Sequence, residues 1–262
     1  MTDTGQIVRA TALGGPTVLL EYGGLTVITD PALDPAGTDY ALGPVKLRKT
    51  ADSASTPDRL GGLDAVLLSH DQHPDNLDGA GRQVLAAAGR VLTTPEAAGR
   101  LGGNAEALEP WASIELSRPA GGPVTVTAVP ARHGPAGTEQ LTGTVTGFVV
   151  SADGLPTVYV SGDNVESAYL DEVAERFDGV DVAVLHLGAA QLGPFGPALL
   201  SWTAEQGADA ARRLGAWRVI AVHDNGWDHF TQDRAAAVAA FQAAGLDDVL
   251  ADAEPGVAVP LS

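Results

Sequence analysis

Short apolar runs separated by turn residues make up most of the first 160 positions of the chain. Runs of this length, with polar and apolar residues alternating in several of them, are typical of strands. Gly23 and Gly24 separate two such runs and predict a tight hairpin. We therefore expect strands at 6–12, 17–22, 25–29, 65–68, 90–93, 114–116, 124–130, 145–151 and 157–160.

The pattern changes after Asp163, where apolar positions at helical spacing alternate with short apolar runs. This second pattern predicts helices at 165–177, 203–214 and 232–244, strands at 180–185 and 218–222, and two earlier helices at 79–88 and 95–101. Strands followed by alternating strands and helices indicate a layered α/β architecture with helices packed on sheets. No linker interrupts the sequence, so we expect one domain over 1–262. The polar stretch at 30–60 is too long for a simple connector and is expected to cover a site.

Composition excludes several classes of protein and of site. The chain carries 15 Lys and Arg against 33 Asp and Glu, a formal charge of −18, which argues against nucleic acid and anionic membranes as partners. It has no cysteine, so disulfides and thiolate metal sites are excluded. The first residues lack the basic and apolar regions of a signal peptide, and no apolar run is long enough to span a membrane. We expect a cytoplasmic protein with a small-molecule partner.

Histidine or aspartate, both common metal ligands, follows several of the apolar runs. Five runs end directly before a candidate ligand, and these ligands are His70, His133, Asp163, His186 and His223. Catalytic and binding groups often gather beyond the carboxyl ends of strands. The segment after His70 adds His73, Asp75 and Asn76, and because His73 precedes a proline this segment is expected to be extended, not helical.

Each of these residues also has a purely structural interpretation. A histidine after a strand is more often a hydrogen-bonded turn residue than a ligand, and His186 lies between two leucines as a core residue would. Asp75 or Asn76 could cap the helix that follows, and Asp163 could form an Asx turn. The conjunction favours a metal site, because metal binding needs imidazoles and carboxylates that converge from different strands.

Six segments occur in an order that identifies a resemblance: "LTVITDP" with Asp30 and Pro31, "LLSHDQHPDNLD", "ARHG", "VYVSGDN", "VDVAVLHLGAAQLG" and "RVIAVHDNGW". In this order and spacing the chain resembles the metallo-β-lactamase superfamily over nearly its whole length, and most closely the branch related to ascorbate-6-phosphate lactonase. The resemblance implies a four-layer αββα sandwich with the site at one edge of the two sheets.

The resemblance also implies a set of metal ligands. His70, His73, His133 and Asp163 would hold one divalent ion, zinc first with Mn²⁺ or Fe²⁺ as alternatives, and Asp75 with His223 would bind a second. The family signature His-x-His-x-Asp-His is altered here, because one residue is inserted between the histidines and Asn76 replaces the last. An amide is a weaker ligand than an imidazole, so we expect one tightly bound ion per chain.

The remaining residues of the altered signature have assigned roles as well. Asn76 is expected to cap the following helix or to hydrogen-bond the substrate. If two ions bind tightly, Asp71 or Asp78 is expected to replace the missing ligand.

Function follows from the same resemblance. We expect a metal-dependent hydrolase in which the ion acts as a Lewis acid and lowers the pKa of a bound water. Asp75 and His223 are the candidate catalytic residues. Residues expected to support the site or contact substrate are Asn76, His186, Trp227 and Asp224, with Asp228 and His229 either in the same role or in a solvated loop.

The substrate is only loosely indicated. Analogy with the lactonase branch favours a small cyclic ester or a related carbonyl compound. A small phosphodiester is the second enzymatic candidate. A non-catalytic protein that binds metal or a metabolite on the same fold is the contrasting interpretation, and the altered signature supports it.

Overall fold

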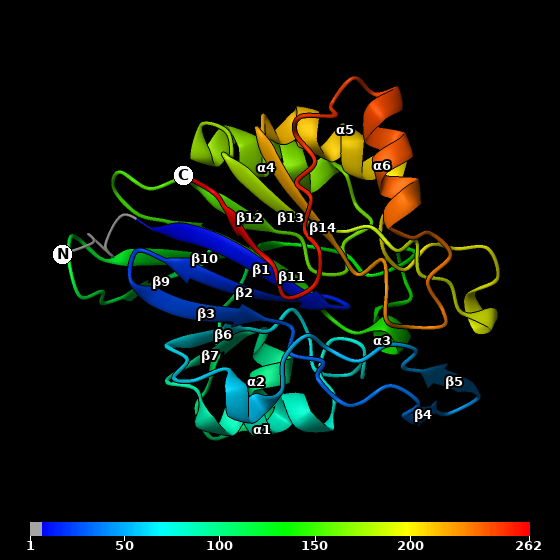
Figure 1. Ribbon diagram of the computed structural model, residues 1–262. Helices are drawn as coiled ribbons and strands as arrows, with labels where there is room; N and C mark the ends of the chain where they lie inside the picture. Colours follow the sequence, from blue (N-terminus) through cyan, green and yellow to red (C-terminus); the bar gives the residue numbers. More distant parts are fainter. Residues whose placement is uncertain (1–6) are drawn as a thin grey trace.

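Two β-sheets face each other at the centre of the molecule, as the computed structural model in Figure 1 shows for residues 7–262, the part of the chain that it describes. The first sheet combines an antiparallel half with a half in which β3, β6, β7 and β8 run parallel. Its strands, in spatial order, are β15 (Ala258–Pro260), β1 (Val8–Gly14), β2 (Thr17–Tyr22), β3 (Leu25–Thr29), β6 (Ala65–Leu67), β7 (Val91–Thr93) and β8 (Ala105–Ala107).

The second sheet places the carboxyl ends of four strands at one edge. Strands β12, β13 and β14 are parallel, and β10 has the same direction because the antiparallel β11 lies between β10 and β12. The spatial order is β14 (Arg218–Val222), β13 (Val182–His186), β12 (Val158–Val160), β11 (Thr146–Ser151), β10 (Val124–Pro130) and β9 (Ser113–Leu116).

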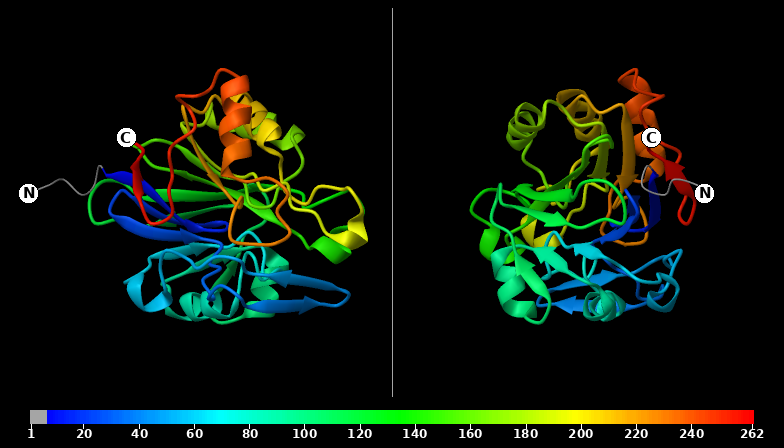
Figure 2. Two further views of the ribbon diagram at one scale, coloured as in Figure 1. Left: turned by 45° about the vertical axis from the view of Figure 1, so that its right-hand side comes forward. Right: turned by 90° about the vertical axis from the view of Figure 1, so that its left-hand side faces the viewer.

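Helices cover the outer face of each sheet (Figure 2). Those on the first sheet are α1 (Gly79–Ala87) and α2 (Pro95–Leu101), and those on the second are α4 (Ala168–Phe177), α5 (Ala204–Leu214) and α6 (Arg234–Ala243). The order helix, sheet, sheet, helix confirms the α/β sandwich expected from the sequence. No helix within residues 7–262 is long and apolar enough to cross a membrane.

Three apolar layers hold these elements together. In β6, Ala65 and Leu67 face the core between the two sheets, whereas Val66 packs under α1. In β13, Val184 faces that same central core and Leu185 packs under the helices of the second sheet. Side chains alternate between the two faces of a strand, so strands buried on both faces appear in the sequence as continuous apolar runs.

Several elements differ from the expectation. The strand expected at 6–12 is observed at Val8–Gly14, and Gln6 lies outside the residues that the structure describes. Elements that the apolar pattern did not predict are the hairpin of β4 (Asp39–Leu42) and β5 (Val45–Arg48), the helix α3 (Glu139–Thr142), β8, β15, and the 3₁₀ turns Pro57–Arg59 and Gly193–Phe195. The hairpin lies inside the polar stretch at 30–60, where Leu47 packs against Trp227.

Asp78 caps helix α1, so the expectation that Asp75 or Asn76 caps it is wrong. The Asp78 carboxylate accepts a hydrogen bond from the backbone N–H of Gly81, 2.8 Å away. The residues before it form a separate turn, in which the carbonyl of His73 accepts from the N–H of Asn76. Because Asp75 and Asn76 lie in this turn and do not cap the helix, their side chains are available to the site.

The close contact of α1 with the loop after β3 gives a first prediction. A Cβ added at Gly81 would lie 1.8 Å from the carbonyl oxygen of Pro31, whereas one at Gly99 in α2 would meet no heavy atom within 4 Å. We expect Gly81→Ala to lower the free energy of unfolding by roughly 1–3 kcal/mol through overpacking. Gly99→Ala, the matched control, should raise it by about 0.5–1 kcal/mol. Urea unfolding followed by circular dichroism measures both, and an unchanged stability in Gly81→Ala would contradict the tight contact.

Candidate metal centre

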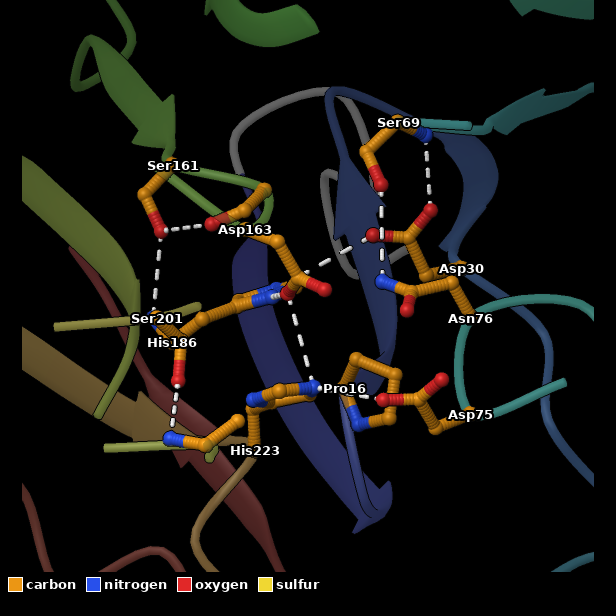
Figure 3. Close-up of polar contacts among 12 residues, drawn as sticks. Pro16, Asp30, Ser69, Asp75, Asn76, Ser161, Asp163, His186, Ser201 and His223 are labelled. Atoms are coloured by element: carbon orange, nitrogen blue, oxygen red, sulfur yellow. Dashed lines mark hydrogen bonds and ion pairs between the residues drawn. The ribbon is translucent and has the colours of Figure 1, made fainter. Parts of the chain in front are cut away.

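All six histidines of the chain line one site beyond the carboxyl ends of the central strands. They lie at or after the ends of β6, β10, β13 and β14, and several of them cluster with the carboxylates Asp75 and Asp163. Figure 3 shows both carboxylates with His186 and His223. The histidines are His70, His73, His133, His186, His223 and His229. The site therefore draws its donors from both sheets.

The first group is a triad of imidazoles. Nδ1 of His73 lies 2.9 Å from Nε2 of His70 and 3.1 Å from Nε2 of His133. The outer nitrogen of His70 contacts Ser69 Oγ at 2.9 Å, and that of His133 contacts the carbonyl oxygen of Leu200 at 2.6 Å. A carbonyl only accepts hydrogen bonds, so Nδ1 of His133 carries the proton and its Nε2 lone pair faces the other two rings.

This triad fits a divalent metal ion better than a hydrogen-bond network. Burial lowers the pKa of His133 to about 4 and holds that of His70 well below its usual range, so both rings are neutral. The three nitrogens that face one another are Nε2 of His70, Nδ1 of His73 and Nε2 of His133. A single proton on one of them can form a hydrogen bond to a second, but the third nitrogen is then left without a partner. A fourth donor, Asp163 Oδ2, lies 3.7 Å from Nε2 of His133. Three imidazoles and a carboxylate form a typical zinc-binding set.

The second group joins a carboxylate to two imidazoles. Oδ2 of Asp75 lies 3.2 Å from Nε2 of His223 and 3.1 Å from Nε2 of His229. Oδ1 of Asp163 is 3.4 Å from the same nitrogen of His223. The two oxygens of Asp163 thus face different groups, so this carboxylate could contribute a donor to a cation in either group.

Both carboxylates are ionised despite their burial. Burial alone would raise the pKa of Asp75, but the imidazoles of His229 and His223 outweigh it and hold the pKa well below its usual range. The same balance, with His223 and His186 as the main partners, lowers the pKa of Asp163. Ionised carboxylates surrounded by imidazole nitrogens are suited to bind a cation.

The two groups differ in how firmly their rings are held. Ser69 and Leu200 fix the outer nitrogens of the first triad. The outer Nδ1 atoms of His223 and His229 are buried and have no hydrogen-bond partner among residues 7–262. Ligand imidazoles usually donate their second N–H to a protein group, which orients the ring. The first position is therefore the better defined of the two.

A strained backbone turns His223 into the site. His223 follows β14 with a φ of 58°, a conformation that costs energy for a non-glycine residue. Its N–H donates to the carbonyl of Gly15 at 2.7 Å, and a Cβ added at Gly188 would lie 1.9 Å from its carbonyl oxygen. The turn is thus fixed between the first hairpin and the loop after β13.

The residues assigned supporting roles lie at different distances from the ligands. Asn76 donates from Nδ2 to Ser69 Oγ at 3.5 Å, and it does not replace the missing imidazole. The ring of Trp227 lies 6.3 Å from that of His229, between centroids, and packs under the β4–β5 hairpin. Asp224 is buried and accepts a hydrogen bond from Nδ2 of Asn225.

Neither acidic substitute for the missing ligand is available. Asp71 pairs with Arg100 at 2.5 Å, and Asp78 caps α1. His229 takes the third place in the second group instead. The sequence pattern missed it as a ligand because it follows no apolar run and lies in the loop after β14. The available signal was composition, since His229 completes the set of six histidines.

The fold and this donor set agree with the family comparison. The model of the beta-lactamase superfamily domain matches residues 26–223. The chain belongs to this superfamily, as the sequence segments indicated, although the match does not distinguish the lactonase branch. His229 lies beyond the matched residues. No match was found among curated proteins.

Similar solved structures span nearly the whole chain. An isothiocyanate hydrolase from Delia radicum gut bacteria is 22% identical with a TM-score of 0.81, over 96% of this chain and 98% of its own. A possible metal-dependent hydrolase from Veillonella parvula is 20% identical with a TM-score of 0.80, over 97% and 100%. Igni18, a metallo hydrolase from Ignicoccus hospitalis, is 21% identical with a TM-score of 0.71, over 98% and 99%. At these identities the likeness establishes the fold.

The donor set predicts that removing metal destabilises the protein. Ions that bind only the folded state add about 2.7 kcal/mol when their free concentration is 100 times the dissociation constant. For a chain of this size that corresponds to a melting temperature higher by roughly 5–10 °C. Calorimetry before and after chelation, and after zinc is returned, measures the shift. An unchanged melting curve, with metal removal verified by elemental analysis, would contradict the site.

The position of His229 predicts which substitution affects the second ion. His229→Ala should reduce the affinity for a second ion while the first stays bound, because only Asp75, His223 and the shared Asp163 remain. Asn76→Ala is the matched control and should keep the stoichiometry of the wild type. Zinc titration calorimetry with elemental analysis decides, and equal stoichiometry in wild type and His229→Ala would exclude His229 as a ligand.

Proposed function

We propose that the protein is a metal-dependent hydrolase with a site for two divalent ions. One observation carries this proposal: Asp163 lies between two donor groups and turns one oxygen toward each. When bound, divalent ions supply Lewis acidity and lower the pKa of a coordinated water toward neutrality. Five imidazoles and two carboxylates favour zinc, with Mn²⁺ and Fe²⁺ as alternatives.

The candidate ligands divide into two sets, one for each metal position. His70, His73 and His133 would hold the first ion, and Asp75, His223 and His229 would hold the second, with Asp163 available to both. Because the rings of the first group are held by hydrogen bonds and those of the second are not, the first position should have the higher affinity for metal. Asp75 is ionised, so it accepts hydrogen bonds and cannot donate one. Its role is to hold the ion and orient the nucleophile, and it does not act as a general acid.

Substrate approaches from the side of His73 and His229. These two are only partly buried, whereas the other five candidate ligands are buried. The ring of Phe230 borders this side, with its centroid 4.2 Å from that of His223 and 4.6 Å from that of His229. Phe230 and Leu192 pack with Trp227 and the β4–β5 hairpin in one apolar cluster. This wall suits an apolar substituent next to the reacting atom.

Positive charges around the site are already paired. Arg132, next to His133, forms an ion pair with Glu166 at 2.7 Å, and Arg100 pairs with Asp71. Lys49 is buried beside Asp78, and its ammonium lies 5.5 Å above the ring of Trp227. None of these three cations is free to bind a phosphate. An uncharged substrate is therefore favoured over a phosphodiester or a phosphorylated lactone.

The substrate class that combines these features is a small, uncharged carbon electrophile with an apolar substituent. Lactones belong to it, as the sequence resemblance implies. Isothiocyanates belong to it as well, and the similar structure of an isothiocyanate hydrolase supports their inclusion. In both, hydrolysis begins with attack of water on an electron-poor carbon.

The proposal predicts turnover that depends on Asp75. Metal-replete protein should hydrolyse members of a panel of apolar lactones and isothiocyanates, and phosphodiesters poorly. Asp75→Asn should lower kcat/KM by about 10²–10⁴-fold, the size of effect seen when a group acting directly at the reacting centre is removed. Asp224→Asn is the matched control, since Asp224 is also buried but its carboxylate contacts Asn225.

The contrasting function has its own signature in the same assay. Full metal occupancy without turnover on any substrate class would favour a protein that binds metal or a metabolite without catalysis. Turnover of phosphodiesters alone would contradict the argument from paired charges.

A further inference from the structure

His186 belongs to neither of the two donor groups described above, but it forms a third cluster with Asp163 and His223, whose donor atoms lie within 4.8 Å of one another. It ends β13, is fully buried, and contacts two of the candidate ligands (Figure 3). Its Nδ1 lies 2.8 Å from Oδ1 of Asp163. Because Asp163 is ionised and can only accept, Nδ1 of His186 carries the proton and donates it to this hydrogen bond.

The second contact of His186 is with a ligand of the second position. The rings of His186 and His223 are stacked, with centroids 5.0 Å apart and planes inclined by 16°. The ring of Phe230 also packs against His223, whereas Nδ1 of His223 has no hydrogen-bond partner in the described part of the chain. Ring packing therefore replaces the usual hydrogen bond as the restraint on this imidazole.

The far side of His186 faces the first sheet. Its Nε2 lies 3.9 Å from Oδ2 of Asp30. Asp30 accepts from the backbone N–H of Ser69 at 2.7 Å, and Ser69 Oγ in turn contacts Nδ1 of His70. His186 thus lies between the shared carboxylate of Asp163 and Asp30, and Asp30 is linked through Ser69 to the first ligand, His70.

We infer that His186 is a positioning residue that sets the affinity of the second metal position. It fixes Oδ1 of Asp163 by a hydrogen bond and the plane of His223 by stacking, and these are two of the four donors there. The first position depends on other restraints, Ser69 and Leu200. The inference rests on the proposed function only in that the site binds metal. It adds a positioning role for His186, which is not a member of the two proposed ligand sets.

A matched pair of variants tests the role. The amide of Asn can place an N–H near the position of Nδ1, whereas the longer Gln places it near Nε2, out of reach of Asp163. Both are polar and of similar size, so their folds should be comparably stable. Metal-free protein is titrated with cobalt, followed by its visible spectrum, and with zinc in a calorimeter.

We expect His186→Gln to weaken the second ion by about 10–100-fold, the usual effect of losing a partner of a metal ligand, and to weaken the first ion less, because that position depends on His186 only through Asp163. His186→Asn should restore the part of this affinity that the hydrogen bond to Asp163 supplies, while the stacking on His223 is lost in both variants. Equal second-ion affinity in the wild type and His186→Gln would overturn the inference. So would equal loss in both variants, since the hydrogen bond to Asp163 would then contribute nothing to the second position. A wild type that binds no ion would overturn the proposed function as well.

A measurement on the wild type covers the case in which a variant does not fold. In protein labelled with ¹⁵N-histidine, His186 should show a protonated Nδ1 and a bare Nε2, both without metal and with two equivalents of zinc. Loss of the Nδ1 proton when zinc is added would mean that this nitrogen binds the ion, and it would overturn the positioning role.

Discussion

The charge of Asp163 in the interior is the constraint on which the site depends. A carboxylate that is 1% exposed needs compensation from nearby groups, since water does not reach it. Compensation comes from imidazoles that follow β10, β13 and β14, at 2.8–3.7 Å. Because two oxygens face two directions, one buried charge organises two sets of donors. The positions of the other ligands follow from this requirement.

Two packed sheets are needed to satisfy that constraint. Asp30 and His70 come from neighbouring parallel strands of the first sheet, and Asp163, His186 and His223 from neighbouring parallel strands of the second. The apolar core between the sheets holds these two rows of strand ends against each other. Burial of aliphatic side chains far from the site thereby sets the distances between ligands, and the loops need only turn the side chains inward.

Much of the fold and part of the site could be predicted from the sequence. Strands buried on both faces have an unmistakable apolar pattern, and a ligand placed directly after such a strand is found with it. The place of His229 among the candidate ligands and the β4–β5 hairpin were missed for one physical reason. They belong to long loops, where tertiary packing against Trp227 and Phe230, not local periodicity, decides the conformation. The cap of α1 was misplaced because an extra turn after His73 has no signature of its own.

The absence of cysteine gives the two donor groups a further meaning. His70 follows a strand of the first sheet, and His229 lies in the loop after β14 of the second sheet. Two metal ions that share Asp163 as a ligand would therefore link distant parts of the chain and close a very large loop. Covalent cross-links restrict the unfolded chain in the same way, and larger loops are restricted more. A chain without disulfides would then carry a reversible cross-link between its two halves. Its strength would depend on the supply of metal in its surroundings.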